Sequence, residues 1–338
     1  MKTLDSMSVP IIQGGMGIGI SMGGLAGAVA AEGGMGVIST ANIGFREDDF
    51  YTDTQEADRR ALIREIEKAR EISGGRGLIA INVMVATTNA WDMVEVAVSH
   101  GIDAVISGAG LPLELPAHVV GADVLIAPIV SSGKAARLMC KSWARNHDRR
   151  PDFIVIEGSE AGGHLGFKEE QMMAGTADPL ENILKDVLEA APGIPTFVAG
   201  GVFDKYDIKR FMTLGAAGVQ IATRFIATEE CDATQGFKDI IIGAAADDAE
   251  IIISPVGMPG RALKTPLMDK VAAGTRVGSD KCIGCIRTCR HDTTPYCINR
   301  ALINAYYGNF EEGLFFCGSN VGKVGPMTTV KKLMKELR

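Results

Sequence analysis

The stretch that decides the fold is TFVAGGVFDKYDIKRFMTLGAAGVQIA, residues 196–222, which reads as one strand–helix–strand unit. It begins with a largely apolar run, Thr196–Ala199, and continues through a segment of helical spacing, Lys205–Leu214. A second largely apolar run, Gly218–Ala222, closes it. Apolar strands separated by a helix predict two parallel strands with the helix packed outside the sheet.

The same alternation of strand and helix extends back toward the N-terminus. Further apolar runs that predict strands lie at Val9–Ile12, Gly36–Ser39, Leu78–Val83, Ala104–Ile106, Val124–Pro128 and Phe153–Ile156. Segments that predict helices lie between them at Ala61–Glu71, Trp91–Ser99, Gly133–Arg145 and Leu180–Ala190. Eight such units match the count of a TIM barrel better than that of a doubly wound sheet. The sequence therefore predicts an α/β protein, a (β/α)8 TIM barrel over residues 1–225.

The remaining third of the chain lacks this alternation. We expect residues 226–299 to form a cap or extension that contains most of the cysteines. Residues 300–338 are expected to form C-terminal helices that pack back on the barrel, with helical segments at Arg300–Tyr307 and Val330–Leu337.

Composition and charge restrict the class of protein. With 338 residues, 46% of them hydrophobic and 22% charged, the chain has enough apolar residues for a large core. The net charge of -7 argues against nucleic acid as a partner, because phosphate binding needs a basic surface. The sequence contains neither a signal-peptide pattern nor an apolar run of the roughly 20 residues that a bilayer requires. We therefore expect a cytoplasmic protein with a small-molecule substrate and no membrane partner, and an oligomer is allowed.

Glycine is concentrated where the predicted strands end. The first strand runs into Gln13–Gly17, the fourth into Ser107–Gly110, the sixth into Glu157–Gly166 and the seventh into Gly200–Gly201. In TIM barrels these strand ends carry the chemistry, and loops after the seventh and eighth strands often hold a phosphate. Glycine lets backbone N–H groups approach phosphate oxygens closely. The pattern predicts a phosphorylated cofactor at this end of the barrel.

Five motifs in these positions resemble one known family. They are PIIQGGMG at 10–17, INVM at 81–84, EGSEAGGHLG at 157–166, VAGGV at 198–202 and GAAGVQIATRF at 215–225. In order and spacing they are similar to the FMN-dependent nitronate monooxygenases, formerly called 2-nitropropane dioxygenases. The flavin-containing enoyl-ACP reductases, close relatives of that family, share the same motifs.

The resemblance implies FMN across the mouth of the barrel and His164 as the active-site histidine facing the substrate. A histidine suits proton transfer near neutral pH. The phosphate of FMN would be held by Gly201 and by the run Gln220, Ile221, Ala222 and Thr223. The remaining residues implied to contact FMN are Gln13, Gly14, Gly15, Met16, Asn82, Glu157, Gly162, Gly163 and Gly200.

Two residues of the EGSEAGGHLG motif bear on the substrate. Nitronate enzymes commonly carry glutamine in place of Glu157 and often arginine in place of Leu165, so both residues are more similar to the enoyl reductases. The leading expectation is oxidation of alkyl nitronates with dioxygen. One alternative is an enoyl-ACP (enoyl-thioester) reductase that uses NAD(P)H as electron donor, and another is a non-catalytic flavin and iron–sulfur electron-relay protein.

A cysteine-rich segment, KCIGCIRTCRHDTTPYCIN, occupies residues 281–299. Its spacing, C-x2-C-x3-C-x7-C, supplies four thiols, which is a complete ligand set for zinc or for an iron–sulfur cluster. It is similar to the [4Fe-4S] segment that follows the FMN barrel in 2,4-dienoyl-CoA reductases. Three alternatives are open for Cys282, Cys285, Cys289 and Cys297: a [4Fe-4S] cluster, structural zinc, or free thiols.

Overall fold

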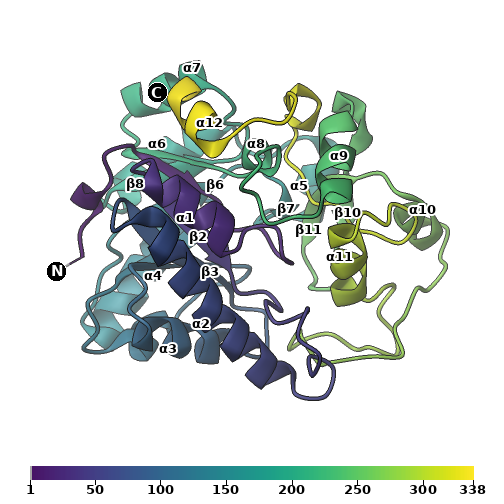
Figure 1. The fold of residues 1–338 in the computed structure, drawn as a ribbon. Helices are drawn as coiled ribbons and strands as arrows, with labels where there is room; N and C mark the ends of the chain where they lie inside the picture. Colours follow the sequence, from purple (N-terminus) through teal and green to yellow (C-terminus); the bar gives the residue numbers. More distant parts are fainter. Residues whose placement is uncertain (1) are drawn as a thin grey trace.

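A closed barrel of eight parallel strands forms the body of the protein. The structure is a computed structural model that describes residues 2–338. Around the barrel the strand order is β1-β2-β3-β4-β5-β6-β8-β9, and β9 pairs with β1 to close it. The strands are β1 (Ile11–Gln13), β2 (Met35–Ser39), β3 (Leu78–Met84), β4 (Ala104–Gly108), β5 (Leu125–Val130), β6 (Ile154–Glu157), β8 (Thr196–Ala199) and β9 (Gly218–Ile221). The predicted TIM barrel is confirmed (Figure 1).

Helices cover the outside of the barrel between successive strands. They are α1 (Gly23–Ala31), α2 (Thr54–Ser73), α3 (Ala90–Ser99), α4 (Gly133–His147), α6 (Leu180–Ala190), α7 (Lys205–Thr213) and the short α8 (Thr223–Ile226). Two 3-10 turns, η1 (Leu4–Ser6) and η2 (Leu115–Val119), lie before β1 and between β4 and β5. Side-chain caps mark several helix starts: the carboxylate of Asp204, for example, accepts from the N–H groups of Tyr206 and Asp207 at the start of α7.

The strand residues divide into two packed layers because successive side chains point to opposite faces of a strand. Ile12, Val37, Ala80, Ala127 and Phe197 belong to a cluster that fills the inside of the barrel. Their immediate neighbours along the strands instead pack outward in the larger cluster that includes the helices. Both faces of every barrel strand are therefore buried, which explains why the strands read as continuous apolar runs.

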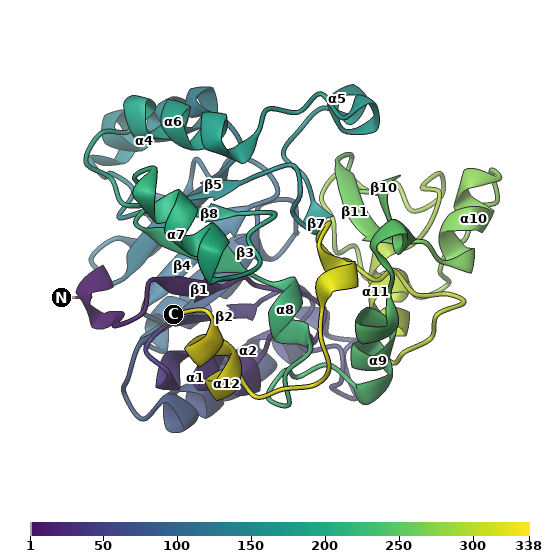
Figure 2. The same ribbon diagram turned by 90° about the horizontal axis from the view of Figure 1, so that it is seen from above.

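The residues after β9 build a cap that lies beside the barrel (Figure 2). The cap contains α9 (Gln235–Gly243), η3 (Ala246–Asp248), β10 (Ala249–Ile253), β11 (Pro259–Leu263), α10 (Pro266–Ala272), α11 (Ile298–Tyr306) and η4 (Val321–Lys323). It has its own buried cluster, in which Tyr296, Leu314 and Leu267 are 1%, 0% and 2% exposed. A barrel loop enters this cap: β7 (Gly163–His164) pairs antiparallel with β11, giving a second sheet of order β10-β11-β7. The short helix α5 (Glu169–Ala174) follows β7.

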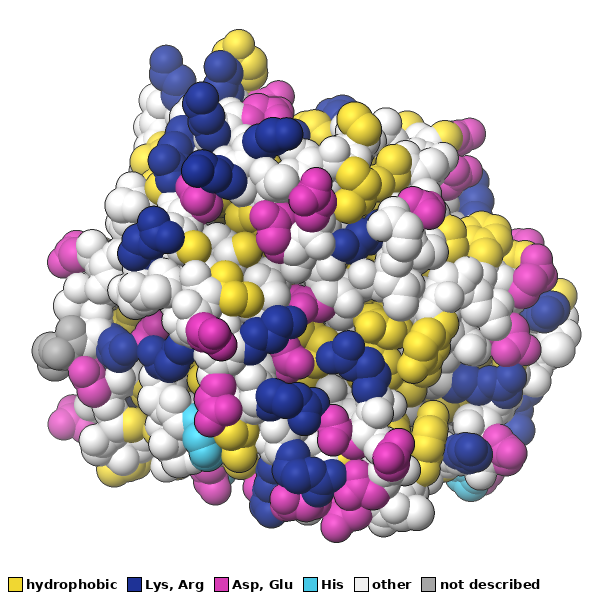
Figure 3. Space-filling model, viewed as in Figure 1, with side chains coloured by type: hydrophobic (Ala, Val, Ile, Leu, Met, Phe, Trp, Pro, Cys, Tyr) yellow, Lys and Arg dark blue, Asp and Glu magenta, His cyan; other side chains and the backbone are white. Residues whose placement is uncertain are grey.

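The last helix, α12 (Val330–Glu336), packs on α1 of the barrel. Its buried residues are Val330, Leu333 and Met334, whereas Lys331, Lys332 and Lys335 are exposed. Lys and Arg side chains therefore gather where α12 and α7 lie, at the upper left of Figure 3. No helix within residues 2–338 is both long enough and apolar enough to cross a membrane.

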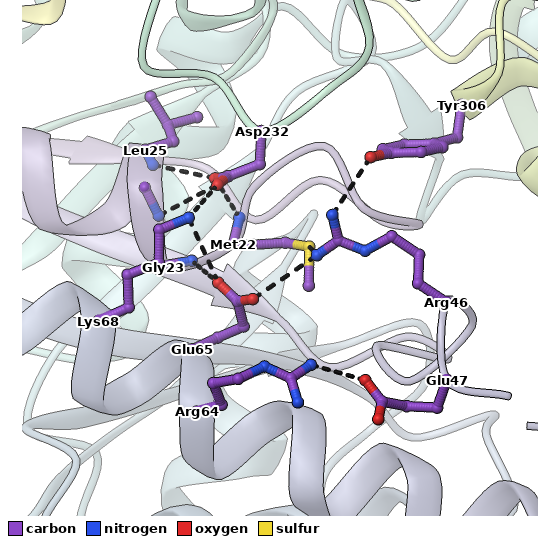
Figure 4. A network of polar contacts seen from close by, with 11 residues as sticks. Met22, Gly23, Leu25, Arg46, Glu47, Arg64, Glu65, Lys68, Asp232 and Tyr306 are labelled. Atoms are coloured by element: carbon purple, nitrogen blue, oxygen red, sulfur yellow. Dashed lines mark hydrogen bonds and ion pairs between the residues drawn. The ribbon is translucent and has the colours of Figure 1, made fainter. Parts of the chain in front are cut away.

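The start of α1 is held by side chains from distant parts of the chain (Figure 4). The carboxylate of Asp232 accepts hydrogen bonds from the N–H groups of Met22, Gly24 and Leu25 at 2.9, 3.2 and 3.0 Å. Glu65 of α2 accepts from the N–H of Gly23 at 2.9 Å. These N–H groups belong to the unpaired first turn of the helix, so the two carboxylates replace a local cap. They fix the end of the glycine-rich loop that follows β1.

Candidate active site

A cavity of about 410 Å³ lies where the C-terminal ends of the barrel strands meet the cap. Most of the residues implied by the motifs line it: Gly14, Gly15, Met16, Asn82, Glu157, Gly162, Gly163, His164, Gly200, Gly201, Gln220, Ile221, Ala222 and Thr223. The barrel brings them together because parallel strands all end at the same rim. Residues up to 209 positions apart in the chain therefore share one space.

Gln13 is the exception among the residues that the motifs implied to contact FMN. Its side chain is fully buried and does not line the cavity. Its Oε1 accepts from the N–H of Val37 at 3.0 Å and its Nε2 donates to the carbonyl of Gly14. Because β1 pairs with β2, this amide links the end of β1 to the middle of β2, and the residues after it line the cavity.

The rim after β8 and β9 presents bare backbone to the cavity. Gly201 has a φ of +85°, and a Cβ atom there would lie 2.3 Å from Oε2 of Glu160. Only glycine fits this position without a shift of its neighbour. The N–H groups of Gly201 and Thr223 make no hydrogen bond to another described residue. Two backbone donors are therefore free to meet an anion in the cavity.

Glu157 stands at the end of β6 with its side chain facing the cavity. Burial raises the pKa of this carboxyl to about 8, and the backbone N–H of Gly166 lowers it only in part. Below that pH the carboxyl is protonated, so at neutral pH Glu157 offers one O–H donor and one carbonyl acceptor.

His164 is placed by the cap sheet and not by a barrel strand. It pairs with Gly260 of β11, and the N–H of the next residue, Leu165, donates to the carbonyl of Pro259 at 2.8 Å. Its Nε2 lies 2.8 Å from Oγ of Ser254, and its ring meets the ring of Phe316 edge-on, with 5.1 Å between centroids. Burial lowers the pKa of His164 to about 4, so the imidazole is neutral at physiological pH.

The cap contributes a wall that the motifs did not predict. Met258, Leu302 and Phe316, all of the cap, line the cavity. Behind the rim, Nδ2 of Asn320 donates to the carbonyl of Gly201 at 2.9 Å, and the N–H of Gly318 donates to Oγ1 of Thr223 at 3.0 Å. No strand-end pattern or motif marks these residues in the sequence. Their role follows only from the packing of the cap on the barrel.

The cysteine segment lies next to the barrel loop after β3. The N–H of Thr88 donates to the carbonyl of Cys285 at 3.1 Å, and the N–H of Arg287 donates to the carbonyl of Ala86 at 3.0 Å. Of the four segment thiols only that of Cys285 lines the cavity. Burial, followed by the nearby Cys297 and Cys289 thiols, raises the pKa of Cys285 to about 12.

The predicted metal centre is not supported by this arrangement. Among the described residues, no group of three or more His, Cys, Asp and Glu side chains could hold a metal ion. This includes Cys282, Cys285, Cys289 and Cys297, all of which are free thiols in the structure. The prediction rested on the spacing of the four cysteines along the chain. The conformation of their segment is instead determined by packing on the cap core and on the loop after β3.

Comparison with known proteins decides the family. The sequence model described as nitronate monooxygenase matches residues 1–338. The protein belongs to the nitronate monooxygenase family. This family assignment confirms the prediction made from the motifs, and with it the prediction that the protein is a flavin-dependent oxidoreductase. An enzyme is favoured over the electron-relay alternative.

Individual relatives share only modest sequence identity with this chain. The chain is 27% identical over 276 residues to a (3aS,4S,5R,7aS)-5-hydroxy-7a-methyl-1-oxo-octahydro-1H-indene-4-carboxyl-CoA dehydrogenase of Mycobacterium tuberculosis, covering 82% of this chain and 69% of that protein. It is 26% identical over 300 residues to a probable nitronate monooxygenase of Staphylococcus aureus, covering 79% and 78%.

Two solved structures share the fold across nearly the whole chain. FabK from Thermotoga maritima gives a TM-score of 0.77 at 24% identity and covers 99% of this chain and 92% of that one. The nitroalkane oxidase from Streptomyces ansochromogenes gives a TM-score of 0.76 at 21% identity and covers 99% and 96%. At these identities the likeness concerns the fold alone.

Proposed function

We propose that the protein is an FMN-dependent oxidoreductase that oxidises alkyl nitronates with dioxygen. The observation that carries this proposal is the cavity itself, in which free backbone donors and a neutral histidine face one space within a nitronate monooxygenase fold. Small molecules bind in such concave sites at the C-terminal face of TIM barrels.

The residues at the rim fit the FMN phosphate. The free N–H groups of Gly201 and Thr223 would donate to phosphate oxygens, and no side chain at Gly201 obstructs the approach. Gly14 and Gly15 offer a side of the cavity without side chains for the flat ring, next to Met16. Bound FMN would supply the capacity to accept electrons from the substrate and pass them to dioxygen.

The protein's own side chains would control the proton and the position of the substrate. Neutral His164 would hold the nitronate by hydrogen bonding or move a proton at its ring nitrogen. Protonated Glu157 would donate a hydrogen bond within the cavity without placing a second negative charge beside an anionic substrate. Phe316 and Met258 of the cap would exclude water from the reacting groups.

A second function, reduction of an enoyl-thioester with NAD(P)H, is favoured by Glu157 and Leu165. Leu165 is apolar and fully buried, so no positive charge stands beside His164 at this position to attract an anionic substrate. The Mycobacterium tuberculosis relative is named for a substrate that is a CoA thioester, which supports the same class.

Anaerobic stopped-flow absorbance separates the two functions. The flavin-loaded protein is mixed in turn with an alkyl nitronate, NADH and NADPH, and the loss of flavin absorbance is followed. Rapid bleaching by the nitronate alone, reversed by dioxygen, is the expected result. Rapid bleaching by NADH or NADPH, with none by the nitronate, would replace the proposal by the thioester reductase.

Replacement of His164 tests its assigned role. We expect His164→Ala to retain flavin and to lower kcat by roughly 10²- to 10⁴-fold, the usual contribution of a general acid or base. The matched control is His291→Ala, which removes an exposed histidine of the cap. Steady-state turnover of His164→Ala equal to that of the control would show that another group acts on the substrate.

A further inference from the structure

The imidazole of His164 is held on one side only. Its Nε2 is paired with Oγ of Ser254 at 2.8 Å, while Nδ1 makes no hydrogen bond to another described residue. No fully buried side-chain nitrogen or oxygen among the described residues lacks a partner. Nδ1 is therefore open to the cavity that His164 lines. The two ring nitrogens therefore have different surroundings. Nε2 is bonded within the protein, and Nδ1 faces the space for the substrate.

Ser254 sits in a constrained turn between β10 and β11 and is 2% exposed. Its backbone N–H donates to the carbonyl of Met258 at 3.0 Å, and its carbonyl accepts from the N–H of Gly257 at 2.9 Å. The hydroxyl oxygen accepts from the N–H of Val256 at 3.4 Å. The side chain cannot turn away from His164 without losing this contact.

A buried phenol supports Ser254 from behind. Tyr296 is 1% exposed, and its Oη donates its one hydrogen to the carbonyl of Ile253 at 3.4 Å. In its hydrogen bond with the Ser254 hydroxyl the phenol oxygen can therefore only accept. A serine oxygen has two lone pairs and one hydrogen. The serine hydrogen is therefore donated to Tyr296, and the serine oxygen accepts from the N–H of Val256 and from Nε2–H of His164.

We infer that Ser254 is a positioning residue whose hydroxyl oxygen accepts from Nε2–H of His164 and so keeps the imidazole proton on Nε2, which leaves Nδ1 unprotonated and facing the substrate. A neutral imidazole has one donor and one acceptor nitrogen, and the partner at one nitrogen sets the state of the other. His164 then presents the lone pair of Nδ1 to the cavity, suited to accept a hydrogen bond or a proton from a bound substrate. This inference rests on the proposed function only in assigning the substrate-facing role to His164.

The tautomer is tested directly by nuclear magnetic resonance of the flavin-loaded protein with ¹⁵N-labelled histidine. The chain has five histidines, and the spectrum of His164→Ala identifies the signals of His164. We expect a protonated Nε2 and an unprotonated Nδ1 in the wild type. Ser254→Ala should shift both signals toward a mixture of tautomers, and Ser254→Thr, which keeps the hydroxyl, should restore them. A proton on Nδ1 in the wild type would overturn the inference.

Kinetics test whether Ser254 acts through His164. We expect Ser254→Ala to lower kcat about tenfold with little change in KM, as for the loss of one hydrogen bond in the reacting complex. Tyr296→Phe should have a smaller effect in the same direction. Ser279→Ala is the control, because the Ser279 hydroxyl lies in the cap and contacts only the N–H of Lys281.

The double variant separates positioning from a structural role. In the His164→Ala background, Ser254→Ala should produce no further loss of kcat, because the group it positions is gone. An equal loss in both backgrounds would mean that Ser254 only maintains the fold and would overturn the inference. If His164→Ala itself leaves turnover unchanged, the proposed function fails, whereas the labelled-histidine spectrum still decides whether Ser254 sets the tautomer.

Discussion

Glu157 and His164 lie at the two ends of one loop, and burial moves both toward their neutral forms. The pKa of Glu157 is raised to about 8 and that of His164 is lowered to about 4. A protonated carboxyl presents one donor and one acceptor, as a glutamine amide does. Protonated Glu157 can therefore form the same kinds of hydrogen bond as the glutamine that nitronate enzymes commonly carry at this position. The sequence identified both residues, but their protonation depends on burial, which only the fold determines.

Flavin loading is the readout for the rim at Gly201. We expect Gly201→Asp to leave the purified protein largely free of flavin, because its Cβ would press on the Glu160 side chain and its carboxylate would repel the charge of a phosphate at this rim. Gly175→Asp is a matched control, since Gly175 also has a positive φ, of 63°, but lies at the end of α5 with open space around it. Flavin content is measured by absorbance after denaturation. Equal flavin content in Gly201→Asp and its control would show that the phosphate does not bind at this rim.

At the scale of elements, long periodic segments were predictable and short ones were not. The helix at 180–190 and the strand at 196–199 match the prediction, because each has a continuous apolar pattern and a clear boundary. The strand β7 consists of Gly163 and His164 alone, too short to show any alternation. It exists because β11, about a hundred residues later, offers backbone partners. The motif located His164, but the element that presents it depends on this long-range pairing.

The N-terminus of α1 makes a separate prediction about stability. We expect Asp232→Ala to lower the free energy of unfolding by roughly 1–3 kcal/mol, because three N–H groups of the first turn lose their acceptor. Asp239→Ala is the control: Asp239 lies on α9 and accepts a single exposed hydrogen bond from Gln235. Urea unfolding measures both. Equal stability of the two variants would mean that solvent caps the helix as well as Asp232 does.

At the scale of the whole molecule, the barrel was evident from the sequence and the packing of the cap was not. Eight apolar runs and the helices between them specify a closed parallel sheet almost without alternative. The position of the cap depends instead on single contacts between distant residues. One example is the 2.6 Å hydrogen bond from Nδ2 of Asn42 to Oδ1 of Asn299. Another is the edge-on contact of Phe45 with Tyr306. Such contacts leave no periodic trace in a sequence.

Asp58, buried under the loop after β2, links the stability of the whole protein to pH. Its carboxylate accepts from the N–H of Gly44 and from Nδ2 of Asn89, both at 2.8 Å, yet burial raises its pKa to about 7. Between about pH 4 and 7 the unfolded chain has lost this proton while the folded protein keeps it. The folded state binds more protons in this range, so the contribution of Asp58 to stability decreases as pH rises, and it is constant above pH 7.

Asp58→Asn removes the titration while it keeps the shape of the side chain. We expect the free energy of unfolding to depend less steeply on pH between 4 and 7, by up to about 1.4 kcal/mol per pH unit. Asp48→Asn, an exposed position in the same loop, should retain the wild-type slope. Urea unfolding at several pH values is the measurement, and identical slopes for wild type and Asp58→Asn would show that Asp58 is already ionised in the folded state.

The pairing of β7 with β11 has a consequence for how enzymes of this architecture diversify. The flavin rim belongs to the barrel, whereas the orientation of the histidine is dictated by a hairpin encoded almost a hundred residues downstream. Exchange of that hairpin between homologues would change the orientation of the histidine while the cofactor-binding site stays the same. Substrate preference in such a scaffold can thus evolve, or be engineered by grafting, without rebuilding the cofactor site.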